Sequence, residues 1–381
     1  MHRRQPVCAR LQTRNEGVER VQVHNEEIQV IEVEENRYCR RGFDENEHRE
    51  VKRNSASAHS VSTGSGHGSA AIAARSSCGP GIRLGAGFGQ SAPSESEQFQ
   101  ARIDEATKAL ASYPDLRNVS DKKRQQLTEF VVGNMFFVFL HEMSHALVHE
   151  MELPVLGRDE DAADAFATLT MLKVGTRLSH RVLVEASKAW FFMNERDQRQ
   201  GIQPAAYDAH GLDAQRAYQI VCLMVGSDKE QFKDLADETN LPDDRQESCQ
   251  DDYRRAAWSW EKVLPSRLRS TDQPRQMIEV AYWPGKGNFD IYEQTFRSIR
   301  ILEIVAGHAA EAYAWPHPLG LEMAACGVST AQWQSSNRKV FLCYELAQEF
   351  AQLYRDYGQE GHAPTKEKWL GPKWWKRANG E

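Results

Sequence analysis

The residues of this sequence with the clearest potential for chemistry form one short motif, HEMSH, from His141 to His145. Two histidines four positions apart lie one turn apart on the same face of a helix, so both imidazoles can bind one metal ion. Glu142 then lies beside the ion, where its carboxylate can take a proton from a zinc-activated water and pass it to a leaving amine. Because five-residue motifs also arise by chance, this interpretation needs a further ligand nearby.

A catalytic zinc site needs a third protein ligand and an open fourth position. His149 continues the stripe of His141 and His145, but eight residues along a helix is about 12 Å, which is too far from His141 for one ion. We therefore expect His149 to be a surface or packing histidine. The metzincin pattern would need glycine and histidine where this chain has Val148 and Met151, so that class is excluded.

Two carboxylates in the next segment, RDEDAAD, can complete the site. The breaker LPVLG precedes this segment, so a second helix is expected over about 159–174, with Glu160 and Asp164 one turn apart on one face. We expect Glu160 to be the third ligand and Asp164 to accept a hydrogen bond from the far nitrogen of His141, which fixes its tautomer. The alternative is that the acidic segment only complements the dipole of its helix.

The element that must carry the HEMSH motif is a long helix over about 121–150. The apolar run from Phe130 to Leu140 leads directly into the motif, and its length falls short of the about 18 apolar residues that a membrane span requires. The sequence therefore predicts a buried helix and no membrane span. The formal charge of −7 gives no basic surface for nucleic acid, so a peptide or protein is the expected partner. The oligomeric state is left open.

The chain divides into four regions by composition and periodicity. Residues 1–95 are polar and rich in Ser, Gly and His, which predicts disorder; the strand-like patch from Ile28 is too isolated to fold by itself. Residues 96–268 show helical periodicity. The pattern over residues 269–360 predicts a β-α-β-β-α unit, with one long helix over about 290–313. A polar tail follows at residues 361–381. The predicted class is α+β, predominantly helical around the active site with a small C-terminal β-containing unit.

Four cysteines in the globular part fall into two locally spaced pairs, Cys222 with Cys249 and Cys326 with Cys343. Two disulfides would imply an oxidising compartment, periplasmic or extracellular, and the alternative is four buried thiols. The N-terminal stretch MHRRQPVCARLQTRNEGVER contains no apolar run of the kind that a signal peptide has.

HEMSH followed by EDAAD resembles the gluzincin metallopeptidases, and the E-x-x-A-D form is distantly similar to the CAAX prenyl protease and HtpX-like branch. That resemblance implies a zincin-like fold and a downstream His and Arg, six positions apart, that bind substrate and the developing oxyanion. His210 and Arg216 reproduce this separation, although Gly211 replaces the proline of that branch. The alternative for His210 is a histidine at a helix N-terminus, with Arg216 as a surface charge. The transmembrane helices of the branch have no counterpart, so membrane substrates are not implied.

The sequence also resembles a bacterial family of metallopeptidases of uncharacterised function. The segments FLHEMSHALVHEMELPVLGRDEDAADAFATL, HGLDAQRAYQIVCLMVGSD, LPDDRQESCQDDYRRAAWSWE, WPHPLGLEMAACG and FLCYELAQEF carry the resemblance, over roughly residues 120–357. Members of that family usually begin with a signal peptide. Either this protein differs from the family in its cellular location, or its start codon is placed too far upstream.

Taken together, the residues predict a metallopeptidase with one Zn²⁺ ion, which His141, His145 and Glu160 hold while Glu142 acts as the general base. The strands of the C-terminal unit are expected to form a sheet whose edge holds an extended peptide beside the zinc. The alternative function is a non-catalytic zinc-binding protein of zincin fold that acts as a binding or structural module. An intact Glu142 argues against it, because a structural site needs no base.

Overall fold

The structure is a computed structural model that describes residues 18–24, 27–33, 94–203 and 207–358, the first two segments by their backbone alone. The predictions for residues 1–95 and for the tail therefore fall largely outside the described residues. In the described part, the helices are α1 (Glu95–Ala109), α2 (Asp121–Glu150), α3 (Asp159–Val174), α4 (Arg177–Gln200), α5 (Asp213–Ser227), α6 (Lys229–Glu238), α7 (Asp243–Val263), α8 (Asp290–Ile299), α9 (Ile301–Ala312) and α10 (Tyr344–Tyr357). The strands are β1 (Val18–His24), β2 (Glu27–Val33), β3 (Ile278–Tyr282), β4 (Leu319–Ala324), β5 (Ala331–Gln334) and β6 (Lys339–Cys343).

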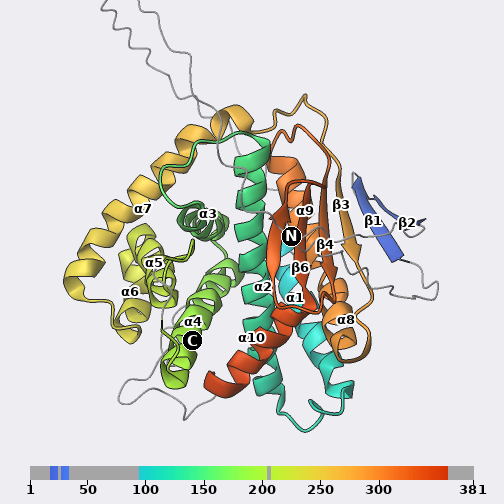
Figure 1. The fold of residues 1–381 in the computed structure, drawn as a ribbon, viewed down its shortest axis with the longest axis horizontal. Coiled ribbons are helices and arrows are strands. Elements are labelled where there is room, and N and C mark those ends of the chain that lie inside the picture. Colours follow the sequence, from blue (N-terminus) through green and yellow to red (C-terminus); the bar gives the residue numbers. More distant parts are fainter. Residues whose placement is uncertain (1–17, 25–26, 34–93, 204–206, 359–381) are drawn as a thin grey trace, which may run out of the picture. The chain divides into compact units, whose positions relative to one another are not determined.

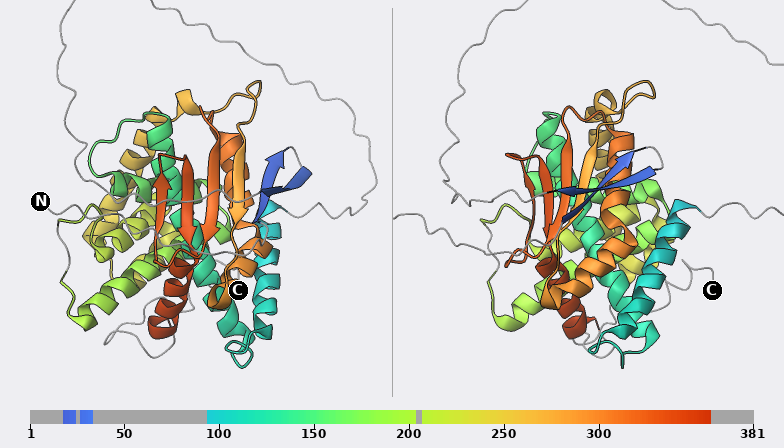
Figure 2. Two further views of the ribbon diagram at one scale, coloured as in Figure 1. Left: turned by 45° about the vertical axis from the view of Figure 1, so that its right-hand side comes forward. Right: turned by 90° about the vertical axis from the view of Figure 1, so that its right-hand side faces the viewer.

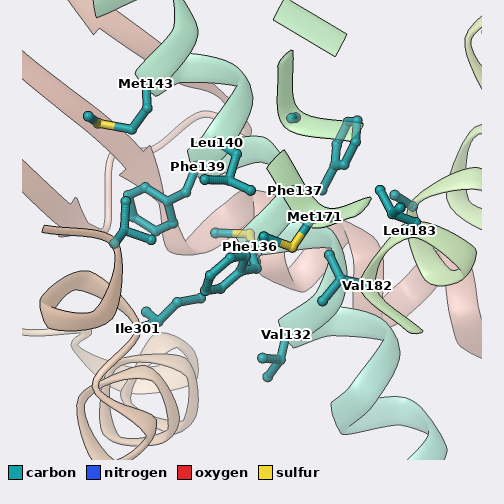
Figure 3. Close-up of a cluster of buried hydrophobic side chains, with 14 of the residues drawn as sticks. Val132, Phe136, Phe137, Phe139, Leu140, Met143, Met171, Val182, Leu183 and Ile301 are labelled. Carbon is teal, nitrogen blue, oxygen red and sulfur yellow. The ribbon is translucent and has the colours of Figure 1, made fainter. Parts of the chain in front are cut away.

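Helix α2 is the central element, with helices α3 to α5 on one side and the sheet on the other (Figure 1). It begins after Ser120, whose hydroxyl accepts a hydrogen bond from the backbone N–H of Lys123. Its apolar side chains point in all directions, toward Met171 of α3, Leu183 of α4 and Ile301 of α9 (Figure 3). A helix that is apolar on every side is buried on every side, which explains why α2 is the core of the molecule.

Helix α2 is also long and apolar enough to cross a membrane by length and composition. In this structure, 83% of its most apolar window is buried within the protein. Among the described residues, no other helix passes this test.

The sheet has the strand order β2-β1-β3-β4-β6-β5, so β5 lies at one edge. Strands β3, β4 and β6 are parallel to one another, and β5 runs antiparallel to β6 (Figure 2). Alternate side chains such as Val280, Leu321 and Val340 are buried against α2 and α9, as the two-residue period of a strand requires. One sheet face is thereby fixed onto the helical part.

Three features of the sheet region correct the sequence predictions. The strand-like patch from Ile28 does not stay isolated, because β2 pairs with β1 and β1 pairs with β3. The single helix expected over 290–313 is two helices, since Arg300 takes a left-handed φ of 63° between α8 and α9. The short strand β5 was not predicted at all. The α+β class itself is confirmed, with mostly helical structure and a small sheet.

Both expected cysteine pairs form disulfides. Cys222 of α5 bonds Cys249 of α7, and between these helices Gly226 lies so close to α7 that a Cβ would meet the carbonyl oxygen of Cys249 at 2.2 Å. Cys326 bonds Cys343 at the end of β6. The two disulfides support an oxidising environment outside the cytoplasm.

Candidate metal centre

Three imidazole nitrogens surround one carboxylate oxygen in the interior of the helical part. Oε2 of Glu160 lies 3.0 Å from Nε2 of His141, 3.5 Å from Nε2 of His145 and 2.9 Å from Nε2 of His210. The two histidines of α2 place their Nε2 atoms 3.2 Å from each other. His141, His145 and Glu160 therefore converge on one point, as the spacing of the motif predicts.

Two packed helices and one loop create this convergence. Helices α2 and α3 lie against each other, and the segment between them contains Gly157, with a φ of 118° that side chains rarely tolerate. Helix α3 starts at Asp159, so Glu160 occupies its first turn. The acidic first turn thus faces the histidines and is also placed to complement the helix dipole, so this geometry is compatible with both interpretations of RDEDAAD.

The arrangement fits a zinc ion by distance and by charge. Ligand bonds of about 2.0–2.2 Å in tetrahedral geometry place ligand atoms about 3.3–3.6 Å apart, close to the separations of 3.0, 3.2 and 3.5 Å among His141, His145 and Glu160. Burial alone would lower the pKa of His141, but its hydrogen bonds to Asp164 and Glu160 outweigh burial and raise the pKa to about 9. The site therefore favours positive charge at His141, which a metal cation on Nε2 would supply.

Two buried polar residues, Asp164 and Arg216, form a hydrogen-bonded chain to Nδ1 of His141, the ring nitrogen that faces away from Glu160. Oδ1 of Asp164 lies 2.9 Å from Nδ1 of His141, the contact expected from their positions. Arg216 of α5 donates to the same carboxylate twice, from Nε at 2.7 Å and from Nη2 at 2.8 Å. Burial would raise the pKa of Asp164, but the bonds from Arg216 and His141 lower it, so Asp164 stays an anion that keeps Nδ1 protonated and Nε2 directed at the ligand site.

Arg216 does not occupy the substrate-binding position that the resemblance implied. Its side chain is 8% exposed, and its guanidinium carbon lies 3.6 Å from the ring centre of Trp190. Two of its guanidinium nitrogens donate hydrogen bonds to Asp164. We therefore expect Arg216 to act as a positioning residue for His141 through Asp164.

Replacing Arg216 with lysine is expected to weaken zinc binding about 10- to 100-fold, because lysine keeps the charge but loses the two-point contact that orients Asp164. Competition with a chromophoric chelator measures the zinc affinity. Replacing Arg254 with lysine is the matched control, since Arg254 is an exposed residue of α7 paired with Asp251. Equal zinc affinity for the Arg216 variant and the wild type would contradict the positioning role.

Glu142 lies at the junction of the metal site and the sheet. Its residue is 8% exposed, and its Oε2 accepts a hydrogen bond of 2.8 Å from the backbone N–H of Trp333 in β5. Burial raises the pKa of Glu142, partly offset by the nearby His141 and His145. A carboxylate with a raised pKa is suited to accept and return a proton near neutral pH.

Trp333 is the contact that sequence reasoning missed. The alternation Ala-Gln-Trp-Gln at 331–334 followed by the turn residues Ser-Ser-Asn is a hairpin signal, but the segment is too short to stand out. His149 does not reach the ligand atoms; its Nδ1 lies 3.3 Å from Glu150.

His210 lies on the open side of the site, with 46% of its side chain exposed. Its Nε2 contacts Glu160, and its Nδ1 lies 3.1 Å from Asp208. Its hydrogen bond to Glu160 raises its pKa, although burial acts in the opposite direction. His210, Glu160 and His141 could therefore share a cation, or His210 could present an N–H to a substrate.

The convergence of two histidines and a glutamate with a buried second glutamate is the arrangement of a metal-dependent hydrolase. Residues 100–264 match the model of a family described as "Putative metallopeptidase". This confirms the resemblance to a metallopeptidase family of uncharacterised function and supports a metal-dependent peptidase. The matched stretch contains every candidate ligand and ends before β3, so it does not include the C-terminal part of the resemblance. Comparison with curated proteins and with solved structures gives no match.

Proposed function

We propose that this protein is a zinc-dependent peptidase of zincin-like fold and gluzincin type, with His141, His145 and Glu160 as ligands of one zinc ion and Glu142 as general base. The observation that carries the proposal is the position of Glu142. Its carboxylate is on the ligand helix and is also bonded to the backbone of β5, so the base lies between the metal ligands and a sheet edge.

The outer edge of β5, which does not pair with another strand in the described part of the chain, supports an extended peptide as substrate. The backbone N–H of Cys343 donates to the carbonyl of Thr330 at 3.0 Å, so alternate residues of β5 pair with β6. The backbone groups of Ala331 and Trp333 then point away from β6, and the bond from Trp333 N–H to Glu142 agrees with this direction. An edge strand with outward backbone groups can add a peptide strand, which would place a peptide bond beside Glu142.

Each group has a defined task in hydrolysis. A bound zinc ion would supply Lewis acidity, which lowers the pKa of water and polarises a peptide carbonyl. Glu142 accepts a proton as water attacks the carbonyl carbon and returns it to the leaving amine. Asp164 keeps His141 in the tautomer that offers Nε2 to the metal, and Arg216 holds Asp164. His210, on the open side, donates an N–H to the oxyanion that develops on the carbonyl oxygen.

Metal removal tests the proposal. The protein loaded with zinc should cleave members of a broad peptide library, should lose this activity after dialysis against 1,10-phenanthroline, and should regain it when zinc is added back. Mass spectrometry of the products identifies the cleaved bond. If the zinc-loaded protein cleaves no peptide, the hydrolase assignment fails and the alternative of a non-catalytic zinc-binding module is favoured.

We also place the protein outside the cytoplasm, in the periplasm or the medium, on the basis of its two disulfides. The four cysteines of these bonds should resist alkylation in denaturant until a reductant is added. Peptide mapping of protein isolated from its native cells checks this, and alkylation of all four without reductant would contradict the assignment.

A further inference from the structure

A second polar cluster lies at the end of α2, apart from the metal ligands. The carboxylate of Glu150 is 2% exposed, and three cation-forming groups surround it. Its Oε2 accepts from Nδ1 of His317 at 2.8 Å and from Nε of Arg338 at 3.2 Å, while Nδ1 of His149 lies 3.3 Å from its Oε1. One buried carboxylate thus organises two imidazoles and one guanidinium.

Each of the three groups is anchored by its inner nitrogen only. The side chains of His149, His317 and Arg338 are 54%, 50% and 43% exposed. Within the described part of the chain, Nε2 of both histidines and the terminal nitrogens of Arg338 have no hydrogen-bond partner. These outer nitrogens are held around one carboxylate and remain open to solvent, where a substrate carboxylate can accept hydrogen bonds from them.

The cluster lies in line with the proposed substrate path. His149 is one turn beyond His145 on the same face of α2, about 6 Å further along the helix. Its ring centre lies 6.0 Å from that of Trp333, whose backbone contacts Glu142. Arg338 ends the turn that follows β5. At about 3.3 Å per residue, an extended peptide on β5 would reach the cluster two or three residues from the cleaved bond.

The backbone at Arg338 adds an independent argument. Arg338 has a φ of 53°, in the left-handed region that is unfavourable for residues other than glycine, asparagine and aspartate. Glycine would adopt this backbone conformation without strain. The advantage of arginine over glycine at this position must therefore come from its side chain. Its contact with Glu150 is made at the expense of local strain.

We propose that His149, His317 and Arg338 form a subsite that binds a carboxylate of the peptide substrate, either an acidic side chain or the C-terminal carboxylate. This inference rests on the proposed peptidase function and specifies its substrate class. The simpler role, a contact that ties α2 to the sheet, accounts for the inner nitrogens but leaves the three exposed outer groups beside β5 without a task.

The test compares matched peptides. A peptide that the zinc-loaded protein cleaves is made with Glu or Gln at the second and third positions on either side of the cleaved bond, and with a free or amidated C-terminus. The carboxylate form of one of these pairs should have about tenfold higher kcat/KM. The position of the effect distinguishes a side chain from a C-terminus. Equal kcat/KM within every pair overturns the subsite while leaving the peptidase function intact.

Variants attribute the preference to the cluster. In a double variant His149→Asn and His317→Asn, the amide nitrogens replace Nδ1 as donors to Glu150 but the outer Nε2 atoms are lost. The ratio of kcat/KM for the carboxylate peptide to that for its amide partner should fall toward one, while the melting temperature stays near that of the wild type. His308→Asn, a change at an exposed histidine of α9, is the control and should keep the ratio. A ratio that survives the double variant overturns the subsite.

A binding measurement separates the two proposals. The zinc-loaded Glu142→Gln protein should bind the carboxylate peptide more tightly than its amide partner in isothermal titration calorimetry, whether or not the wild type cleaves either. Equal binding, or no binding, overturns the subsite. Absence of cleavage with preferential binding overturns only the hydrolase function.

Discussion

Replacing Glu142 with glutamine is expected to lower kcat/KM for peptide cleavage by about a hundred- to ten-thousandfold while leaving the zinc content unchanged. Glutamine has the shape of glutamate, and its amide oxygen can still accept the hydrogen bond from Trp333. It cannot accept the proton of the attacking water. Because Glu142 is not among the three proposed ligands, zinc measured by inductively coupled plasma mass spectrometry should remain near one ion per chain.

A partly buried glutamate of the same helix provides the control. Glu129 pairs with Arg181, and burial raises its pKa as it does for Glu142. Glu129→Gln should alter the melting temperature without removing activity, since this residue lies three turns before HEMSH. If Glu142→Gln cleaved as fast as the wild type, the base would have to be another group. If both variants lost activity equally, the loss would reflect folding.

The proximity of the proposed metal ligands could be predicted from sequence because their geometry is local. His141 and His145 are fixed to one face by the helix period alone, and Glu160 follows after a loop of few residues, so two adjacent helices suffice to bring them together. The same period placed Asp164 on the face of Glu160. In each case, the residues lie on one helix or on two consecutive helices, where regular helical geometry fixes the positions of the side chains.

The contacts that the sequence did not predict connect distant parts of the chain. Arg216 reaches Asp164 from α5, and the backbone of Trp333 reaches Glu142 from the far edge of the sheet. The periodicity of a helix or strand does not predict which distant residue a buried arginine will contact. The resemblance gave Arg216 a role at the substrate, and burial against Trp190 shows a different position.

The edge strand was missed for a related reason. Strand β5 has four residues, two of them glutamines, and it gains stability only by pairing with β6 and packing on α2. The N-terminal strands β1 and β2 likewise depend on β3, which lies far along the chain. Pairing between distant segments is a tertiary property, so single-sequence periodicity underestimates such strands.

Replacing Glu160 with alanine is expected to abolish zinc retention and, with it, peptide cleavage. Glu160 is the only proposed carboxylate ligand, and its oxygen is within 3.5 Å of all three histidines. Removal of a direct ligand should weaken zinc binding by at least about a hundredfold, more than loss of a residue that only orients a ligand. Competition with a chelator of known affinity measures the change.

His210→Ala is the control that defines the ligand set, because His210 contacts the same oxygen of Glu160 from the open side. If His210 only donates an N–H to the oxyanion, the alanine variant should retain zinc while kcat falls about a hundred- to a thousandfold. Loss of zinc from this variant would make His210 a fourth ligand and would close the position that catalysis requires. Retention of zinc by Glu160→Ala would instead remove Glu160 from the site, and with it the gluzincin assignment.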